Sequence, residues 1–263
     1  MTTQSYLIIT YVIVAIAGLA VGSFLNVLVL RFDQFASILK TRSRCPHCKE
    51  EIKWYDLVPF FSYIYLRAKC RNCEKPISFQ YPVVEAVTAI VFSLIYWKFG
   101  LSLEAVLLVA ISALLISIAV YDILNYEIPD ILSYSALVLS IGFVILKLMT
   151  NNELLISNLI PYGYAVLIGG GFLAFLVLIS KEKWMGAGDI TLGALMGVLL
   201  GSPNILLGLF MAFISGSIIG LILLALKQKK LKDAVPFGPF IVFAIFVGLV
   251  WGDILINWYL GIF

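Results

Sequence analysis

The chain consists largely of apolar runs that are about as long as a lipid bilayer is thick. A membrane-spanning helix needs roughly 20 consecutive apolar residues, and such runs recur at 6–30, 82–99, 103–121, 131–149, 161–180, 190–200, 205–226 and 240–262. Hydrophobic residues make up 62% of the 263 residues and charged residues only 13%. A soluble domain is about half apolar and about a quarter charged. The sequence therefore predicts an all-α polytopic membrane protein with about eight transmembrane helices.

The basic residues are divided unevenly between the two sides that eight alternating helices would create. Of the 18 Lys and Arg residues, 16 fall in the loops 31–80, 180–189 and 227–235, and the opposite side keeps Lys98 and Lys147. Cytoplasmic loops of membrane proteins carry the excess of Lys and Arg. We therefore expect the more basic side to be cytoplasmic and both termini to lie outside. The net charge of +3 is too small to indicate nucleic-acid binding.

Two acidic residues lie at the edges of apolar runs, where a charge is costly. Asp122 follows the third run, and Asp189 precedes the sixth in the segment Gly-Ala-Gly-Asp. A carboxylate at the edge of hydrocarbon costs several kcal/mol unless a partner compensates for the lost hydration. Because both helix ends face the cytoplasm in the expected topology, the two carboxylates should lie at the same membrane depth. We expect that they can face each other.

Such a pair of carboxylates has a specific chemistry. Two like charges a few ångströms apart in a low dielectric do not both ionise readily, so one keeps its proton. The ionised partner can act as a general base toward water, while the protonated one polarises or protonates a carbonyl. Gly186 and Gly188 would leave room for a substrate backbone beside Asp189. The less specific alternative for Asp189 is a helix N-cap.

Two more acidic residues, Glu127 and Asp130, follow Asp122 with no Lys or Arg beside them. Both could be solvated loop residues, and Asp130, which comes after Pro129, suits a helix N-cap. The alternative is that they shape the site, because acidic groups near a carboxylate pair attract a basic part of a substrate.

All four cysteines occur in one loop, in the pattern C-x2-C-x21-C-x2-C formed by Cys45, Cys48, Cys70 and Cys73. This spacing is close to that of a four-thiolate zinc site, and such a site has no open coordination position, so the zinc would be structural. Two local disulfides or a redox pair are the alternatives, and the charge rule disfavours them because it places the loop in the reducing cytosol. His47 could replace a thiolate, although four sulfurs already satisfy zinc.

We expect three parts in the chain. Residues 1–30 form a first transmembrane helix, residues 31–80 a cytosolic four-cysteine zinc-binding domain, and residues 81–263 a membrane-embedded domain that contains both aspartates.

A series of short motifs runs along the whole chain in a recognisable order: GSFLNV at 22–27, CPHC and CRNC, YPVVE at 81–85, YDILNYEIPD at 121–130, GAGD at 186–189 and VPFGPF at 235–240. GAGD resembles the GxGD signature of intramembrane aspartyl proteases. Together the motifs closely resemble those of the type IV prepilin peptidases. The chain departs from the family pattern at two places: Thr191 stands where members usually carry Lys, and the first helix leads into RFDQFAS (31–37) where members usually have Arg-Leu-Pro.

The resemblance implies a function. Such enzymes cut the short basic leader from prepilins and pseudopilins at the cytoplasmic face of the bacterial inner membrane, after a glycine and before a hydrophobic helix. Bifunctional members then methylate the new N-terminus with S-adenosylmethionine. The catalytic aspartates of the family match Asp122 and Asp189, and its zinc ligands match the four cysteines. In the family, the N-terminal part of the chain, which here contains Asn26 and Glu85, is linked to methyl transfer. The resemblance therefore makes these two residues candidates for cofactor binding, without assigning a role to either.

Two other classes of protein remain as alternatives. Intramembrane carboxylates and a short helix after a Gly-rich turn also occur in proton- or cation-coupled transporters. However, both acids fall at the cytoplasmic end of their helices, and no inverted repeat is visible. A membrane scaffold that binds a partner through the zinc loop would leave Asp122 and Asp189 without a role.

Overall fold

The computed structural model describes residues 3–32, 42–151, 155–230 and 233–261. Within these ranges the regular structure is helical, and the extended contacts are isolated bridges. The expected all-α class is therefore confirmed. Lys40 and Lys232, which contribute to the count of basic residues, lie outside the described residues.

Seven described helices are long and apolar enough to cross a membrane. They are α1 (Thr3–Leu30), α4 (Gln80–Phe99), α5 (Leu103–Asn125), α6 (Asp130–Thr150), α7 (Ile156–Ser180), α9 (Asn204–Ala225) and α10 (Gly238–Leu260). The eighth apolar helix, α8 (Ala187–Leu200), has 14 residues and is shorter than a span. The chain is thus a multi-pass membrane protein, and all eight predicted apolar helices are present.

Helix boundaries differ from the prediction where a helix continues beyond its apolar run. α5 extends to Asn125, so Asp122 lies inside the last turn and not after the helix. α8 begins at Ala187, which places Asp189 in its first turn. Hydropathy marks the part of a helix that matches hydrocarbon, whereas main-chain hydrogen bonding continues for a turn beyond it.

The chain forms two compact units, Met1–Leu101 (unit 1) and Ser102–Phe263 (unit 2). The division into parts at residues 30 and 80 remains a prediction, because the compact units combine these parts differently.

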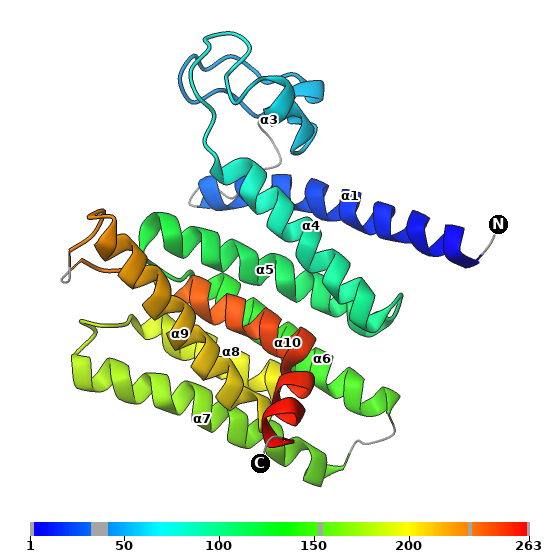
Figure 1. The fold of residues 1–263 in the computed structure, drawn as a ribbon, viewed down its shortest axis with the longest axis vertical. Helices are drawn as coiled ribbons and strands as arrows, with labels where there is room; N and C mark the ends of the chain where they lie inside the picture. Colours follow the sequence, from blue (N-terminus) through cyan, green and yellow to red (C-terminus); the bar gives the residue numbers. More distant parts are fainter. Residues whose placement is uncertain (1–2, 33–41, 152–154, 231–232, 262–263) are drawn as a thin grey trace. The chain divides into compact units, whose positions relative to one another are not determined.

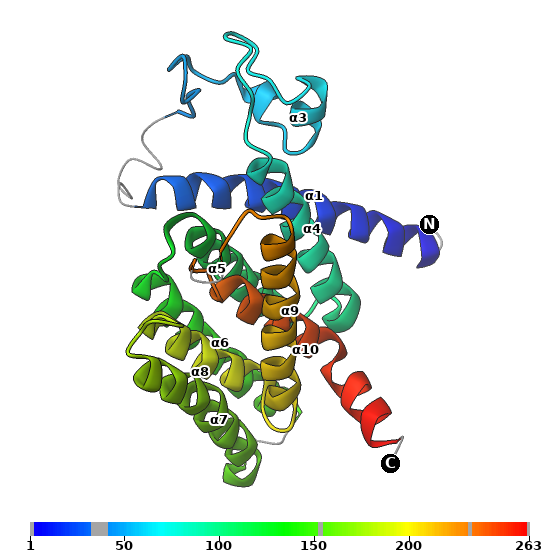
Figure 2. The same cartoon turned by 60° about the vertical axis from the view of Figure 1, so that its left-hand side comes forward.

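In unit 1, α1 and α4 cross closely in an antiparallel sense (Figure 2). A Cβ added at Gly18 would lie 2.5 Å from Ala89 Cα, and one added at Gly22 would lie 2.7 Å from Glu85 Cα. The two backbones approach so closely that a larger side chain does not fit, as is usual where small residues mediate helix packing in membranes. Residues 42–79 form a lobe at the start of α4 that contains the 3-10 helix η2 (Trp54–Leu57) and α3 (Phe61–Tyr65) (Figure 1).

In unit 2, the short α8 lies beside α7 and also packs against α6, α9 and α10 (Figure 1). Its side chains at Leu192, Leu195 and Met196 are completely buried. Glycines bring α7 and α8 together, since a Cβ at Gly197 would meet the Ala165 carbonyl oxygen at 2.5 Å. Because α8 is covered by other helices, it does not have to match the thickness of the lipid.

The α7–α8 contact gives a matched test of this packing. A Cβ at Gly169 would clash with the Gly193 carbonyl oxygen, whereas a Cβ at Gly171, two residues along α7, meets nothing within 4 Å. We expect Gly169→Ala to lower the free energy of unfolding by about 1–3 kcal/mol through overpacking. Thermal unfolding in detergent checks this, with Gly171→Ala as the control. Equal effects of the two substitutions would contradict the packing described here.

Candidate active site and metal centre

Asp122 is buried near the end of α5, with 4% of its surface exposed. Its Oδ2 atom accepts a hydrogen bond of 2.9 Å from the main-chain N–H of Gly238, the first residue of α10. The N–H groups at a helix start have no partner within the helix and favour negative charge. The start of α10 therefore compensates for part of the hydration that Asp122 loses.

Gly238, whose N–H bonds to Asp122, is a site residue that was not predicted from the sequence. A Cβ at this position would lie 2.7 Å from Asp122 Oδ2 and 3.5 Å from Leu192 Cδ1. Only a glycine lets the main chain of α10 approach the carboxylate this closely. The available signal was the VPFGPF motif, in which a Gly-Pro pair precedes an apolar run, as is typical of a helix start. Nothing in that motif points to a residue more than 100 positions earlier.

Asp189 is buried in the first turn of α8, with 5% of its surface exposed. Its Oδ2 atom accepts a hydrogen bond of 3.0 Å from the N–H of Gly186. Asp189 therefore takes part in capping the start of α8, but from the third position of the helix: the N-cap residue is Gly186 and not Asp189. The other oxygen, Oδ1, is buried and has no hydrogen-bond partner among the described residues. A buried polar atom of this kind calls for an explanation.

The structure brings together the helix ends that carry the two carboxylates. The N–H of Gly238 bonds to Asp122, and a Cβ at Gly238 would lie 3.5 Å from Leu192, which is one turn after Asp189 on α8. The end of α5, the start of α8 and the start of α10 therefore meet at one point.

The glycines before Asp189 differ in their surroundings. A Cβ at Gly188 would lie 2.7 Å from Ile128 Cβ, so the space beside Gly188 is filled by the α5–α6 loop. A Cβ at Gly186 meets nothing within 4 Å. Of the two positions predicted to admit a substrate backbone, Gly186 is the open one.

Glu127 and Asp130 are exposed in and just after the same loop. Asp130 is the first residue of α6, and Pro129 holds the N-cap position that the sequence suggested for Asp130. The structure does not place either side chain against Asp122 or Asp189.

The two cofactor candidates lie in unit 1, where the GSFLNV and YPVVE segments meet. Asn26 is fully buried; its Nδ2 donates to the carbonyl oxygens of Gly22 (3.2 Å) and Tyr81 (3.3 Å), and its Oδ1 accepts from Gln80 Nε2. These contacts use both amide N–H groups and one of the two lone pairs of the amide oxygen. A role of Asn26 in binding S-adenosylmethionine stays a prediction.

Glu85 is also committed within unit 1. It is 5% exposed, and its Oε2 accepts a hydrogen bond of 2.7 Å from the N–H of Phe60. This contact joins α4 to the lobe and holds the carboxylate inside the protein. A role of Glu85 in cofactor binding likewise stays a prediction.

The four cysteines lie in two loops with the same conformation. Each loop contains three equivalent main-chain hydrogen bonds. In the first loop, the N–H groups of Cys45, Lys49 and Ile52 donate to the carbonyl oxygens of Glu50, Cys45 and Ser43, respectively. In the second loop, the N–H groups of Cys70, Glu74 and Ile77 donate to those of Lys75, Cys70 and Ala68. Such repeated turns direct two thiols from each loop toward a common point.

The four sulfur atoms match a tetrahedral metal site. They all lie within 4.8 Å of one another, and Cys45 Sγ is 3.8 Å from Cys73 Sγ. A zinc–sulfur bond of about 2.3 Å in tetrahedral geometry implies sulfur–sulfur distances of about 3.8 Å. None of the four cysteines forms a disulfide, and His47, which is exposed, is not part of the cluster. The residues therefore fit a structural zinc ion.

Main-chain N–H groups favour the thiolate form in the first loop. The N–H of Cys48 lowers the pKa of the Cys45 thiol, and the N–H of Glu50 lowers the pKa of Cys48. A thiolate is the form that binds metal, so these hydrogen bonds favour metal binding by the first loop. In the second loop, the N–H of Lys75 lowers the pKa of Cys73, but burial and the neighbouring thiols outweigh it and raise this pKa to about 11.

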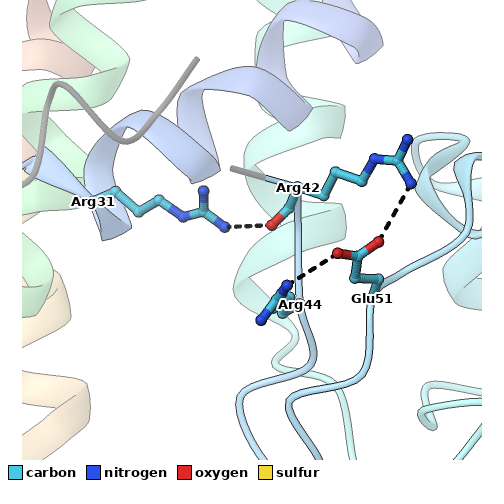
Figure 3. A network of polar contacts seen from close by, with 4 residues as sticks. All are labelled: Arg31, Arg42, Arg44 and Glu51. Atoms are coloured by element: carbon cyan, nitrogen blue, oxygen red, sulfur yellow. Dashed lines mark hydrogen bonds and ion pairs between the residues drawn. The ribbon is translucent and has the colours of Figure 1, made fainter. Parts of the chain in front are cut away.

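A polar network joins the first cysteine loop to the end of α1 (Figure 3). Glu51 accepts hydrogen bonds from Arg42 (3.3 Å) and Arg44 (3.0 Å), and Arg31 donates to the Arg42 carbonyl oxygen at 3.4 Å. Arg44 and then Arg42 hold the pKa of Glu51 below its usual range. Because the side chains are largely exposed, we expect the network to contribute little stability.

Comparison with known proteins assigns the chain to a family. Residues 16–99 match the bacterial peptidase A24 N-terminal domain, and residues 108–221 match the type IV leader peptidase family. A protein of Legionella pneumophila is 31% identical over 95% of this chain and 94% of its own length, and one of Bacillus subtilis is 32% identical over 94% and 97%. Both are named prepilin leader peptidase/N-methyltransferase. The chain belongs to the type IV leader peptidase family.

The two domain matches of this family fall in different units. The first lies within unit 1 and includes the four cysteines, and the second lies within unit 2 and includes Asp122 and Asp189. The second match ends before Gly238. No solved structure matches the chain.

Gly238 can be tested separately from the aspartates. Gly238→Ala places a methyl group against Asp122 Oδ2, and displacing a reacting group by about 1 Å costs roughly 100-fold in rate. We therefore expect leader-peptide cleavage to slow by about that factor, with KM little changed. Gly220→Ala is the control, because a Cβ there meets nothing within 4 Å. Full activity of Gly238→Ala would show that the contact with Asp122 is unimportant.

The metal site has an independent test. We expect the purified protein to bind about one zinc ion per chain and to lose it in the Cys45→Ser and Cys73→Ser variants, because four thiolates complete the tetrahedron. The measurement is metal content together with the reactivity of the thiols. His47→Ala should keep its zinc. Loss of zinc from that variant, or retention by both Cys→Ser variants, would contradict the four-sulfur assignment.

Proposed function

We propose that this protein is a membrane aspartyl endopeptidase that removes the short basic leader of type IV prepilins or pseudopilins, with Asp122 and Asp189 as the catalytic residues. The observation that carries the proposal is the pair of buried carboxylates at the ends of two helices, each with one oxygen bonded to a main-chain N–H. The relatives named prepilin leader peptidase/N-methyltransferase support the same reaction and substrate.

In the proposed reaction, the two aspartates share one proton and activate a water molecule. The ionised carboxylate takes a proton from the water, whose oxygen attacks the scissile carbonyl carbon, and the protonated carboxyl group gives its proton to the carbonyl oxygen. The tetrahedral gem-diol then collapses: the C–N bond breaks, the leaving nitrogen takes up the proton that came from the water, and one hydroxyl group of the diol returns its proton to the other carboxylate. The products are a carboxylic acid and an amine, and the pair of aspartates again shares one proton. The unpartnered Oδ1 of Asp189 is suited to hold the water or the shared proton.

The substrate is proposed to enter from the side of the membrane. The apolar segment of the prepilin would lie among the helices, and its basic leader would remain at the cytoplasmic rim, where Glu127 and Asp130 are exposed and attract it. A glycine before the scissile bond would help the helix to unwind and expose its amide. Gly186, which has open space beside it, is where the substrate backbone would approach Asp189.

The proposed location is the cytoplasmic membrane of a bacterium, with the cysteine lobe and the aspartates on the cytoplasmic side and both termini outside. The uneven distribution of basic residues supports this orientation.

The zinc ion would supply folding energy to a lobe with a small apolar core. S-adenosylmethionine-dependent methylation of the new N-terminus is proposed as a second activity from the names of the relatives, and no step of it is assigned to residues. The transporter alternative gains no support from these relatives.

The aspartates are tested by conservative substitution. Asp122→Asn and Asp189→Asn remove the ability to exchange a proton but keep the size of the side chain, so we expect cleavage to fall by roughly 1,000-fold or more. Leader loss is measured on a co-expressed prepilin, and the mass of the product, with and without S-adenosylmethionine, reports the added methyl group.

The matched control is Asp253→Asn. Asp253 accepts a hydrogen bond from Asn204 and lies 15 residues along α10 from Gly238, which is about 22 Å of helix. This variant should process the prepilin normally. Normal processing by Asp189→Asn, with the protein inserted in the membrane, would reject the proposed mechanism.

A further inference from the structure

Between the two cysteine loops lies a segment that is unusually rich in aromatic residues. Residues 54–65 read WYDLVPFFSYIY, in which six of twelve residues are aromatic and one, Asp56, is charged. The segment forms η2 and α3, and neither helix contains a buried residue. These apolar side chains therefore do not form the core of the lobe.

The largest side chains of the segment are also among its most exposed. The exposed fraction is 80% for Trp54, 64% for Phe61, 60% for Ile64 and 76% for Tyr65. Phe79, which directly precedes α4 and whose ring contacts that of Tyr63, is 69% exposed. Soluble surfaces rarely present so many large apolar groups together, and such patches mark interaction sites.

The one charge in the segment is neutralised. Asp56 forms an ion pair of 2.6 Å with Arg71, and only 8% of the Asp56 side chain is exposed. The guanidinium group of Arg71 also lies 5.3 Å from the centre of the Tyr55 ring and 5.8 Å from that of Tyr65. The exposed face of residues 54–65 is therefore aromatic and aliphatic, with cationic groups beside it.

A hydrogen bond fixes the segment to a membrane helix. The N–H of Phe60, a residue with a positive φ of 62° that is uncommon for an aromatic side chain, donates to Glu85 Oε2 at 2.7 Å. Glu85 comes five residues after the start of α4, which is about 7 Å along the helix axis. α4 has 20 residues and its length of about 30 Å equals the hydrocarbon thickness. The main chain of Phe60 therefore lies near the edge of the hydrocarbon.

We propose that residues 54–65 are embedded in the headgroup–acyl boundary of the bilayer and anchor the cysteine lobe to the membrane surface. The proposal concerns the placement of the lobe and does not depend on the peptidase reaction. The occupant of the exposed aromatic face is lipid. Trp and Tyr favour the membrane interface because their rings are apolar while their N–H and O–H groups remain near water.

The charges around the segment favour lipid over the apolar part of a protein substrate. Lys53 and Arg71 lie next to the Tyr55 ring, where their cationic groups can reach lipid phosphates while the ring remains at the boundary. Because the two cysteine loops flank the segment on both sides, a bound metal ion would close it into a loop. The metal site would thereby fix the geometry of the membrane anchor.

The proposal is tested with the full chain, loaded with zinc, in bilayer nanodiscs. A variant that keeps Trp54 alone carries Phe at the other four tryptophan positions, Trp97, Trp184, Trp251 and Trp258. We expect blue-shifted Trp54 emission that is quenched by lipids brominated near the headgroup, more strongly than by lipids brominated near the chain end. The quenching should be the same with and without a prepilin, and it should be lost when Phe61 and Ile64 are both replaced by Ser.

Three results would overturn the proposal. One is water-like emission that iodide quenches and bromolipids do not. Another is protection that arises only after prepilin is added, which would assign the surface to the substrate. The third is unchanged bromolipid quenching in the Phe61→Ser, Ile64→Ser variant. Zinc content shows whether each variant is folded. If the single-tryptophan protein does not hold zinc, the Trp54 emission and its quenching are obtained instead as the difference between the wild-type protein and the Trp54→Phe variant.

Discussion

Burying a carboxylate at the end of a membrane helix costs several kcal/mol unless its oxygens are hydrogen-bonded, and unit 2 is built around two such groups. Both receive a main-chain N–H from a helix start: Gly238 of α10 bonds to Asp122, and Gly186, which precedes α8, bonds to Asp189. A main-chain donor cannot move away or titrate, so it fixes each carboxylate without adding a competing charge. One buried oxygen of Asp189 has no hydrogen-bond partner among the described residues.

Close helix contacts hold these donors in place. α8 is too short to span the membrane, and it contacts α6, α7, α9 and α10. Glycines on α7 and α8 allow backbone approaches that any side chain would prevent. In lipid, where helices gain no hydrophobic driving force from association, packing of this kind is a main source of stability. The same principle joins α1 to α4 in unit 1, where it also positions Glu85 to hold the lobe through Phe60.

Much of this could be predicted from the sequence, because the signals are local. Apolar runs identify the membrane helices, and the cysteine spacing identifies the metal site, whose two loops share one conformation. The contacts that complete the site are long-range and give no such signal. Gly238 touches Asp122 across more than 100 residues, and Ile128 occupies the space beside Gly188 that was predicted to be open to a substrate. Asn26, a candidate for cofactor binding because of its motif, also makes contacts that the motif does not predict, with the Tyr81 carbonyl oxygen and the Gln80 side chain.

We propose that Asp122 and Asp189 act together on one bond. The most direct measurement is an experimental structure of the protein bound to a prepilin peptide in which a hydroxyl-bearing transition-state isostere replaces the scissile amide. We expect the hydroxyl group to lie within hydrogen-bond distance of both carboxylates. A hydroxyl group bound away from the two aspartates, or held by one of them while the other faces elsewhere, would contradict it.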